Sequence, residues 1–239
     1  MWFDKLVEDV KSAYPRPDIL RHFLESRERI IYTIEFLRKI GIYGKKVCEI
    51  GAGGIALACK QELKADVDTY DCSQWFRPVY NEFSIPWNFL DLNDPSSFIN
   101  LKHSYDIILL CEVIAHIAYW PVNILAKFKS ALKQGGMLII TTQNLHRFSN
   151  RIRMLSGKPI FANFVPEELK MAHLREYMPE EVVFLLHKAG FSEVHWKLIS
   201  FADVNKPRFV SLSYKFLCRI FPRLSNIVFF WANKTEVKE

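Results

Sequence analysis

The chain has 239 residues, half of them apolar, and a formal net charge of +6. This composition excludes a disordered chain and can fill the core of one large α/β domain or two small ones. The positive excess has a location, because residues 1–145 hold 17 basic and 17 acidic side chains while residues 146–239 hold 15 and 9. An excess of this kind indicates either an anionic partner or a basic solvated surface.

The cysteines and the apolar segments indicate in which cellular compartment the protein is expected. None of the five cysteines lies in a CxxC pair, which is typical of reduced thiols in a cytoplasmic protein. The N-terminus lacks the basic start and continuous apolar stretch of a signal peptide. The longest apolar region, residues 107–125, is interrupted by Glu112, His116, Pro121 and Asn123, so we do not expect a membrane span.

The first 142 residues alternate between two periodicities. Apolar spacing predicts a helix over 19–40, ended by Gly41 and Gly44. Strands are expected over 45–50, 65–71 and 86–92, with a helix over 55–64. Continuous apolar runs at 105–111 and 135–142, separated by a helix over 121–132, are typical of parallel strands covered on both faces. This alternation indicates a doubly wound, Rossmann-like α/β sheet.

The last third continues the pattern with a helix over 179–189 and strands over 193–201 and 226–234. Between these strands, residues 205–223 combine five basic side chains with four aromatic ones and contain no acidic residue. An amphipathic helix of this composition suits peripheral contact with an anionic membrane surface. We expect a single domain with a helical lead (1–44), a cofactor-binding core (45–142), a lid insertion (143–177) and a C-terminal part (178–239).

A glycine-rich turn and a series of acids carry the chemical information. The predicted strand 45–50 ends in Gly51-Ala52-Gly53-Gly54, a turn that lets a ligand approach the backbone closely. Asp71 lies 20 positions after Gly51 at the end of the second predicted strand, where a carboxylate can bind ribose hydroxyls. Asp91 ends the third predicted strand and Glu112 follows the fourth. Three carboxylates at one sheet edge suit a cationic nucleoside better than a pyrophosphate.

Several segments, in order, resemble the class I S-adenosylmethionine-dependent methyltransferases: VCEIGAGG, TYDCS, FLDLND, YDIILLCEVIAHI, ALKQGGMLIITTQN and HLREYMPEEVVFLLHKAGF. Together they cover most of residues 45–191. The terminal NIVFFWANK is similar to the last, antiparallel strand of the family's seven-stranded sheet. The combination looks most like the branch of ubiquinone-biosynthesis O-methyltransferases and small-molecule and sugar methyltransferases.

The resemblance implies S-adenosylmethionine as cofactor and a role for each matching residue. Glu49 and the backbone around Gly51 and Gly53 would hold the methionine part of the cofactor. Asp71 would bind the ribose, and Asp91 would bind the amino group of the adenine.

Four further residues are candidates for contacts with the same cofactor. The resemblance implies that Cys111 and Glu112 line its methionine end. Gln74 and Trp75, just after Asp71, would flank the adenine, although Trp75 has an equally good interpretation as a packing residue.

Two departures from the family pattern matter. The family's third loop glycine corresponds to Ile55, while Gly54 comes one place early, so the turn is expected to be shorter or differently shaped. Some ubiquinone-type members bind a divalent metal through Glu-x-x-Glu-His, but here Glu112 is followed by Ala115-His116 and the second acid is missing. We therefore expect no metal site.

Methyl transfer to a hydroxyl needs a base, and histidine is the usual base near neutral pH. His116, after the fourth predicted strand, is the first candidate, and His146 and His173 follow it. The predicted lid 143–177 carries Arg147, Arg151 and other cations beside aromatic residues. We expect it to cover an anionic small-molecule, glycan-linked or lipid-linked acceptor.

Other functions stay open at this point. A protein that binds S-adenosylmethionine without catalysis would keep the same cofactor residues, and an RNA methyltransferase would use the basic end of the chain. A nicotinamide enzyme is a lesser alternative, because a glycine turn with a distant acid also suits NAD. The neutral cofactor half of the chain disfavours nucleic acid as the partner.

Overall fold

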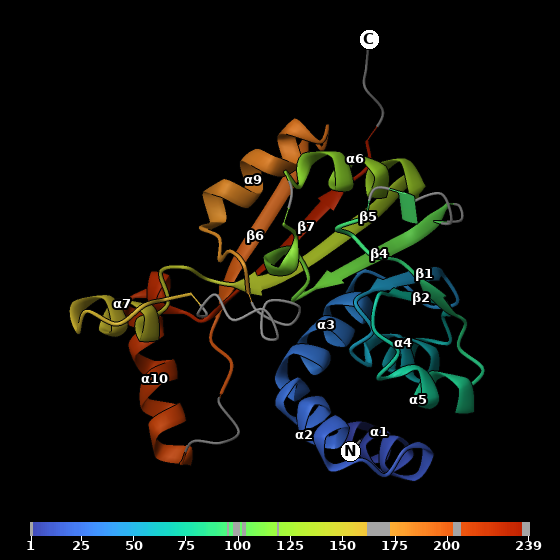
Figure 1. Ribbon diagram of the computed structural model, residues 1–239, viewed down its shortest axis with the longest axis horizontal. Coiled ribbons are helices and arrows are strands. Elements are labelled where there is room, and N and C mark those ends of the chain that lie inside the picture. Colours follow the sequence, from blue (N-terminus) through green and yellow to red (C-terminus); the bar gives the residue numbers. More distant parts are fainter. Residues whose placement is uncertain are drawn as a thin grey trace. The chain divides into compact units, whose positions relative to one another are not determined.

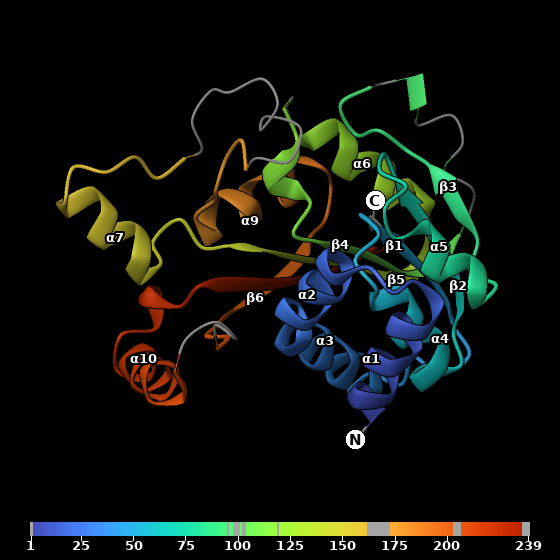
Figure 2. The same cartoon turned by 60° about the horizontal axis from the view of Figure 1, so that its bottom comes forward.

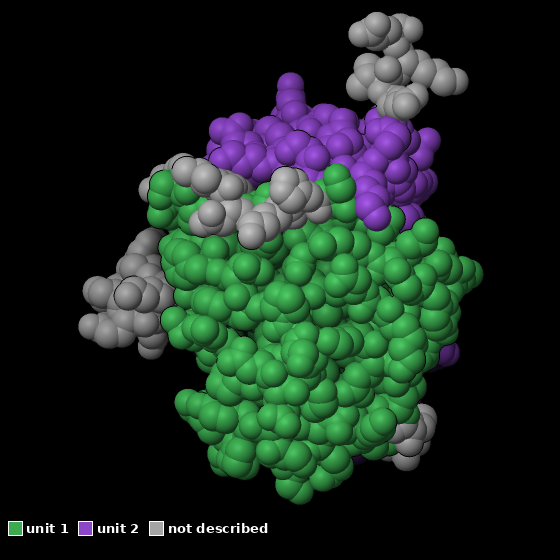
Figure 3. Space-filling view, turned by 90° about the vertical axis from the view of Figure 1, so that its right-hand side faces the viewer, with its two compact units in different colours: residues 1–109 green, residues 110–239 purple. Residues whose placement is uncertain are grey.

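The computed structural model (Figure 1) describes residues 2–94, 96–97, 101, 104–118, 120–161, 173–202 and 207–235. Its strands form a seven-stranded mixed sheet in the order β3-β2-β1-β4-β5-β7-β6. The chain forms two compact units, residues 1–109 and 110–239, coloured separately in Figure 3. The expected α/β class with a seven-stranded sheet is confirmed, and each unit is described by itself below.

The first unit contains parallel strands. β1 (Lys46–Ile50) pairs in parallel with β2 (Asp66–Asp71), and β2 pairs in parallel with β3 (Trp87–Phe89). The first five residues of β4 (Tyr105–Cys111) also belong to this unit. β4 is buried along almost its whole length, as its continuous apolar sequence predicts. β3 is shorter than the expected 86–92, so Asp91 lies two residues beyond the strand.

The helical lead consists of α1 (Trp2–Ala13), α2 (Pro17–Glu25) and α3 (Arg27–Lys39). The single helix expected over 19–40 is wrong, because the chain breaks at Ser26. The Ser26 hydroxyl accepts a hydrogen bond from Arg29 Nη2 (2.7 Å). Apolar periodicity continues across the break and does not reveal it.

A row of aromatic rings runs through the first unit. Phe3 of α1 stacks on Phe23 of α2 with centroids 5.3 Å apart, and Phe23 lies 6.2 Å from Phe76. Phe76 meets Tyr80 edge to face at 5.0 Å. Tyr80 belongs to α5 (Arg77–Glu82), and the neighbouring α4 (Ile55–Leu63) follows the glycine turn. The row therefore joins the N-terminal helices to the elements around that turn.

The second unit is built on β5 (Leu132–Gln143), β7 (Ile227–Asn233) and β6 (Glu193–Ile199). β7 lies between the other two and is antiparallel to both, which confirms the expected antiparallel last strand. α6 (Val122–Ala131) packs on β5, α9 (Pro179–Lys188) packs on β6, and the two helices also contact each other (Figure 1).

Two helices follow the carboxyl ends of strands in this unit. α7 (Phe148–Leu155) comes after β5, and α10 (Arg208–Ile220) comes after β6. Short 3₁₀ turns lie at Ile114–His116 (η2) and Pro222–Leu224 (η3). The helix expected within 205–223 is confirmed, although residues 205–206 lie outside the described residues. Part of the predicted lid, residues 162–172, also lies outside them.

Across the described ranges, no helix combines the length and apolar content needed to cross a membrane.

Candidate functional site

The glycine turn after β1 has two left-handed positions. Gly51 has φ 81°, and its N–H donates to the carbonyl oxygen of Tyr70 in β2 (2.8 Å). Gly54 has φ 93° and is the N-cap of α4. Ile55, where the family pattern has glycine, is the buried first residue of α4. The early glycine therefore supplies the left-handed residue directly before the helix.

Glu49 holds this turn from inside. Its side chain is 1% exposed; Oε1 accepts from the N–H groups of Gly53 (3.2 Å) and Ile55 (3.1 Å). Oε2 accepts from the N–H of Ala56 (3.0 Å) and from the hydroxyl of Tyr80 (2.6 Å). Burial raises the pKa of Glu49, although these donors act in the opposite direction. Four donors match the four acceptor positions of a carboxylate, so Glu49 acts on the loop itself.

Asp71, at the end of β2, faces the same turn. Its Oδ2 accepts from the N–H of Ala52 (2.6 Å), and its Oδ1 accepts from the N–H of Ser73 (2.7 Å). Burial raises the pKa of Asp71 above its ordinary value of 3.8. The side chain is only partly buried, so its oxygens can still accept hydrogen bonds from the hydroxyl groups of a ligand.

Asp71 and Asp91 both lie close enough to the thiol of Cys72 for their negative charges to affect it. Burial, together with the negative charges of Asp71 and Asp91, raises the pKa of Cys72 to about 11. Asp91 Oδ1 accepts from the N–H of Asn93 (2.8 Å). The structure thus brings together two of the carboxylates that the sequence placed at successive strand ends, and it keeps Cys72 protonated at neutral pH.

The two residues expected to flank an adenine lie just beyond Asp71. Gln74 is exposed, and its Oε1 accepts from Arg77 Nη1 (3.3 Å). The Trp75 ring meets the ring of His22 in α2 edge to face, with centroids 4.8 Å apart. Trp75 therefore packs on the helical lead, and its role toward a ligand stays a prediction.

In the second unit, Cys111 and Glu112 lie at the end of β4. Cys111 is buried. Glu112 has φ 60°, a left-handed conformation that is strained for a residue with a Cβ. Two bonds to β5 hold it there: its N–H donates to the Thr141 carbonyl oxygen (2.8 Å), and the Thr141 hydroxyl donates to its Oε1 (3.0 Å). Strain that the surroundings enforce in this way is typical of functional sites.

A pair of histidines lies close to Glu112. The rings of His116 in η2 and His173 are 4.8 Å apart and roughly perpendicular. Burial lowers the pKa of His173, and the neighbouring His116 lowers it further, while the charges of Glu112 and Glu176 oppose this shift. Since the shift favours neutral imidazole, His173 can accept a proton or a hydrogen bond near neutral pH. Two of the three candidate bases are therefore neighbours.

The cations expected on the lid make contacts inside the unit. Arg147 Nη1 lies 2.7 Å from Oε1 of the buried Glu176, whose Oε2 accepts from Asn150 Nδ2 (2.6 Å). Arg151 Nε donates to the His146 carbonyl oxygen (2.9 Å), and Arg153 Nε donates to that of Pro159 (2.8 Å). These contacts tie α7 to the segments on both sides of it. Recognition of an anionic acceptor by these cations stays a prediction.

His146, the other candidate base, occupies a different environment. Its Nδ1 is buried and has no hydrogen-bond partner in the described part of the chain. The structure therefore groups His116 with His173.

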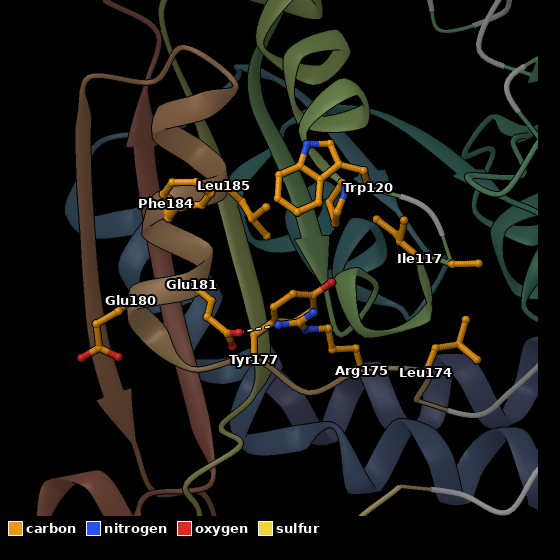
Figure 4. A pocket seen from close by; sticks show the side chains of 11 residues that line it. Ile117, Trp120, Leu174, Arg175, Tyr177, Glu180, Glu181, Phe184 and Leu185 are labelled. Atoms are coloured by element: carbon orange, nitrogen blue, oxygen red, sulfur yellow. Dashed lines mark hydrogen bonds and ion pairs between the residues drawn. The ribbon is translucent and has the colours of Figure 1, made fainter.

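A cavity of about 810 Å³ adjoins the segments that carry the histidine pair. The N–H groups of Leu174 and Arg175 donate to the Ala115 carbonyl oxygen (2.8 and 3.2 Å), which fixes residues 173–175 against η2. Figure 4 shows Trp120 opposite Phe184 of α9, with Arg175 paired to Glu181. The lining is largely apolar: Ile117, Ala118, Trp120, Pro121, Leu174, Arg175, Tyr177, Glu180, Glu181, Phe184 and Leu185.

Sequence reasoning missed the hydroxyl of Tyr80, the contact between the two histidines and the cavity. Tyr80 lies 31 positions after its partner Glu49, and His173 lies 57 positions after His116. Neither spacing belongs to a local motif. Within the described residues, no three His, Cys, Asp or Glu side chains cluster as a metal-binding group.

Comparisons with known proteins found one matching family and several solved structures of similar fold. The methyltransferase-domain family matches residues 20–195. No curated protein matches the sequence significantly. A solved S-adenosylmethionine-dependent methyltransferase from Archaeoglobus fulgidus has a TM-score of 0.57 and 16% identity, covering 88% of this chain and 97% of that one. One from Thermotoga maritima has a TM-score of 0.59 and 17% identity, covering 90% and 93%.

A third solved structure is phosphoethanolamine N-methyltransferase 2 of Haemonchus contortus in complex with S-adenosylmethionine. Its TM-score is 0.56 and its identity 17%; the match covers 86% of this chain and 52% of that enzyme. Identities this low show a shared fold only.

Proposed function

The chain belongs to the methyltransferase-domain family, and we propose that it transfers the methyl group of S-adenosylmethionine to a hydroxyl oxygen. The proposed acceptor is a small molecule or a glycan-linked or lipid-linked intermediate, as in the ubiquinone-biosynthesis-like branch. The observation that carries this proposal is the pair formed by His116 and His173 close to Glu112, next to an apolar cavity.

The residues of the first unit fit the cofactor. Asp71 and Asp91 are neighbouring carboxylates that accept hydrogen bonds, which suits the ribose hydroxyls and the adenine amino group respectively. At Gly53 an added Cβ would lie 3.7 Å from the Gly51 carbonyl oxygen, so a side chain would fill space beside the turn. When bound, S-adenosylmethionine supplies an electrophilic methyl group carried on a sulfonium.

The second unit supplies the groups for proton handling. His116 accepts the proton of the acceptor hydroxyl and becomes positively charged, and the neutral His173 accepts a hydrogen bond from it. Glu112 stabilises the positive charge that develops on the histidine pair. The rest of the rate acceleration comes from holding the acceptor oxygen in line with the methyl group, because in-line displacement needs close alignment of the reacting atoms.

The cavity favours an acceptor with an apolar or aromatic body. Trp120, Phe184 and Leu174 offer apolar surface, while Arg175 and Glu181 neutralise each other as an ion pair. An isolated anionic group would have to compete with Glu181 for Arg175. A hydroxylated aromatic ring or a lipid-linked acceptor suits this lining better than a compact sugar phosphate.

His116→Gln tests the proposed base. We expect kcat to fall by about 10²- to 10⁴-fold, because a positioned base contributes that factor, while the Kd of S-adenosylhomocysteine stays within about twofold. Radiolabelled methyl transfer would be measured on hydroxylated aromatic acceptors with and without an apolar tail. His195→Gln, on β6 and stacked on Trp231, is the matched control and should keep full activity.

Two results would contradict the proposal. Unchanged kcat in His116→Gln would remove this histidine from the reaction. Tight binding of S-adenosylhomocysteine without turnover on any hydroxylated acceptor would favour a regulatory, non-catalytic protein.

A further inference from the structure

The outer face of α10 is apolar and exposed. Phe209, Leu212, Phe216 and Ile220 follow one another at spacings of three or four residues, which places them on one side of a helix. Their exposures are 70%, 57%, 64% and 55%. The opposite side holds the helix on the protein, since the Tyr214 hydroxyl donates to the Leu224 carbonyl oxygen (2.8 Å). α10 thus turns its apolar stripe away from the core.

α7 also turns its apolar side outward and a polar side toward the protein. Its inner side contains the fully buried Asn150, which donates to Glu176. Phe148, Ile152 and Leu155 lie on its other side at spacings of four and three residues, and all three are exposed, Leu155 by 85%. Two helices of one unit therefore expose apolar stripes of a kind that water disfavours.

The segments that carry the two stripes are basic. Segments 143–161 and 207–223 contain eight basic residues and no acidic residue, while the whole chain has a net charge of +6. Two of these cations pair with glutamates outside the segments: Arg147 with Glu176 and Arg223 with Glu180. The basic residues are Arg147, Arg151, Arg153, Lys158, Arg208, Lys215, Arg219 and Arg223.

We propose that α7 and α10 form a docking surface for an anionic lipid bilayer, with both apolar stripes inserted at the headgroup level. Both helices follow the carboxyl ends of strands and extend beyond β5 and β6 in the two views of Figures 1 and 2. An anionic bilayer satisfies both features together, because its acyl region accepts aromatic and aliphatic side chains while its headgroups attract the cations. Nucleic acid would leave the stripes exposed to water.

Sedimentation with vesicles tests this surface. The full chain should bind vesicles of phosphatidylcholine and phosphatidylglycerol, and added salt should weaken binding. The variant Phe209→Ser/Phe216→Ser should lower the partition coefficient by about tenfold or more, since it removes two inserted rings. The matched control Tyr43→Ser/Phe89→Ser, which removes two exposed rings of the first unit, should bind like the original chain.

A charge variant gives a second, independent measurement. Arg151→Gln/Arg219→Gln should weaken binding to anionic vesicles by about fivefold for each cation removed, and it should reduce the salt dependence of binding. Circular dichroism would check that each variant is folded. The four replaced aromatic side chains are each more than half exposed, and Arg151 donates a hydrogen bond to the His146 carbonyl oxygen.

Several outcomes would overturn the proposal. These are absence of vesicle binding, equal binding to pure phosphatidylcholine, or unchanged binding of Phe209→Ser/Phe216→Ser. Steeply salt-dependent binding of RNA without vesicle binding would assign the basic segments to nucleic acid. A dimer that dissociates in the same variant, again without vesicle binding, would assign the stripes to self-association. The assay contains neither cofactor nor acceptor, so its result is independent of the proposed reaction.

Discussion

Glu49 and Asp71 are carboxylates at the ends of neighbouring parallel strands, and burial raises the pKa of both. The hydrogen-bond donors around the two carboxylates differ. Glu49 is enclosed by donors of the loop and of Tyr80, whereas Asp71 accepts one backbone N–H at each oxygen and stays partly exposed. Asp71 is therefore the carboxylate of the two that can meet a ligand.

Asp71 should also make stability depend on pH. Its native pKa lies above 3.8, so the folded chain binds this proton more tightly than the unfolded chain does. Its stabilising contribution is present below about pH 3.8 and is lost as pH rises through the native pKa. Asp71→Asn removes this dependence.

Urea unfolding at several pH values between 4 and 8 measures the effect. We expect the original chain to lose stability relative to Asp71→Asn as pH rises. A difference in unfolding free energy that stays constant over this range would show that the carboxyl is not perturbed.

At the scale of residues, the sequence identified the side chains whose motif is local. The interval of 20 positions between Gly51 and Asp71 placed the acid at the end of β2, next to the turn. Tyr80 and His173 could not be found in this way. Their contacts depend on how distant segments pack, and no periodicity encodes a single hydroxyl or ring contact.

Among the elements, α2 and the glycine turn are in close contact. An added Cβ at Gly54 would lie 2.6 Å from Phe23 Cε2, at a position with φ 93°. Gly44 also has a positive φ, 65°, but no atom lies within 4 Å of an added Cβ. The two glycines therefore separate the cost of backbone strain from the cost of the clash with α2.

Gly44→Ala should destabilise the chain by about 1–2 kcal/mol through backbone strain alone. Gly54→Ala should cost about 1–3 kcal/mol more, because overpacking is added. Denaturant unfolding gives both values, and the double variant with Phe23→Ala should cost less than the sum of its two single changes. Equal costs at the two glycines would mean that Phe23 moves aside freely.

The sequence predicted most elements because their periods are strong. Residues 105–111 form a continuous apolar run, and the structure has β4 over the same residues. The division of the lead at Ser26 was missed, because the apolar periodicity continues across it. The exposure of the α10 stripe was also beyond reach, because periodicity shows that a helix has an apolar side and does not show which way that side faces.

Across the whole molecule, positive charge is concentrated in two segments of the second unit. With eight cations in 143–161 and 207–223, the rest of the chain is slightly acidic. The residues assigned to the cofactor's nucleoside lie in the first unit, apart from these segments in the sequence. Cofactor binding should therefore respond weakly to salt, in contrast to vesicle binding.

S-adenosylhomocysteine should stabilise the whole chain. At a hundred times its Kd, a ligand that binds only the native state adds about 2.7 kcal/mol. For a chain of this length that corresponds to a rise in Tm of about 5–10 °C, measurable by scanning calorimetry. Asp71→Ala should abolish most of the rise, and an unchanged rise would remove Asp71 from the cofactor site.

The internal position of Glu49 has a consequence for redesign. The shape of the turn depends on Glu49 and Tyr80, which are buried, and recognition of the nucleoside is assigned to Asp71 and Asp91. Shape and selectivity thus reside in different residues. Replacing Asp71 and Asp91 by other residues should let the chain bind cofactor analogues with an altered ribose or base. The glycine turn should keep its conformation in such variants.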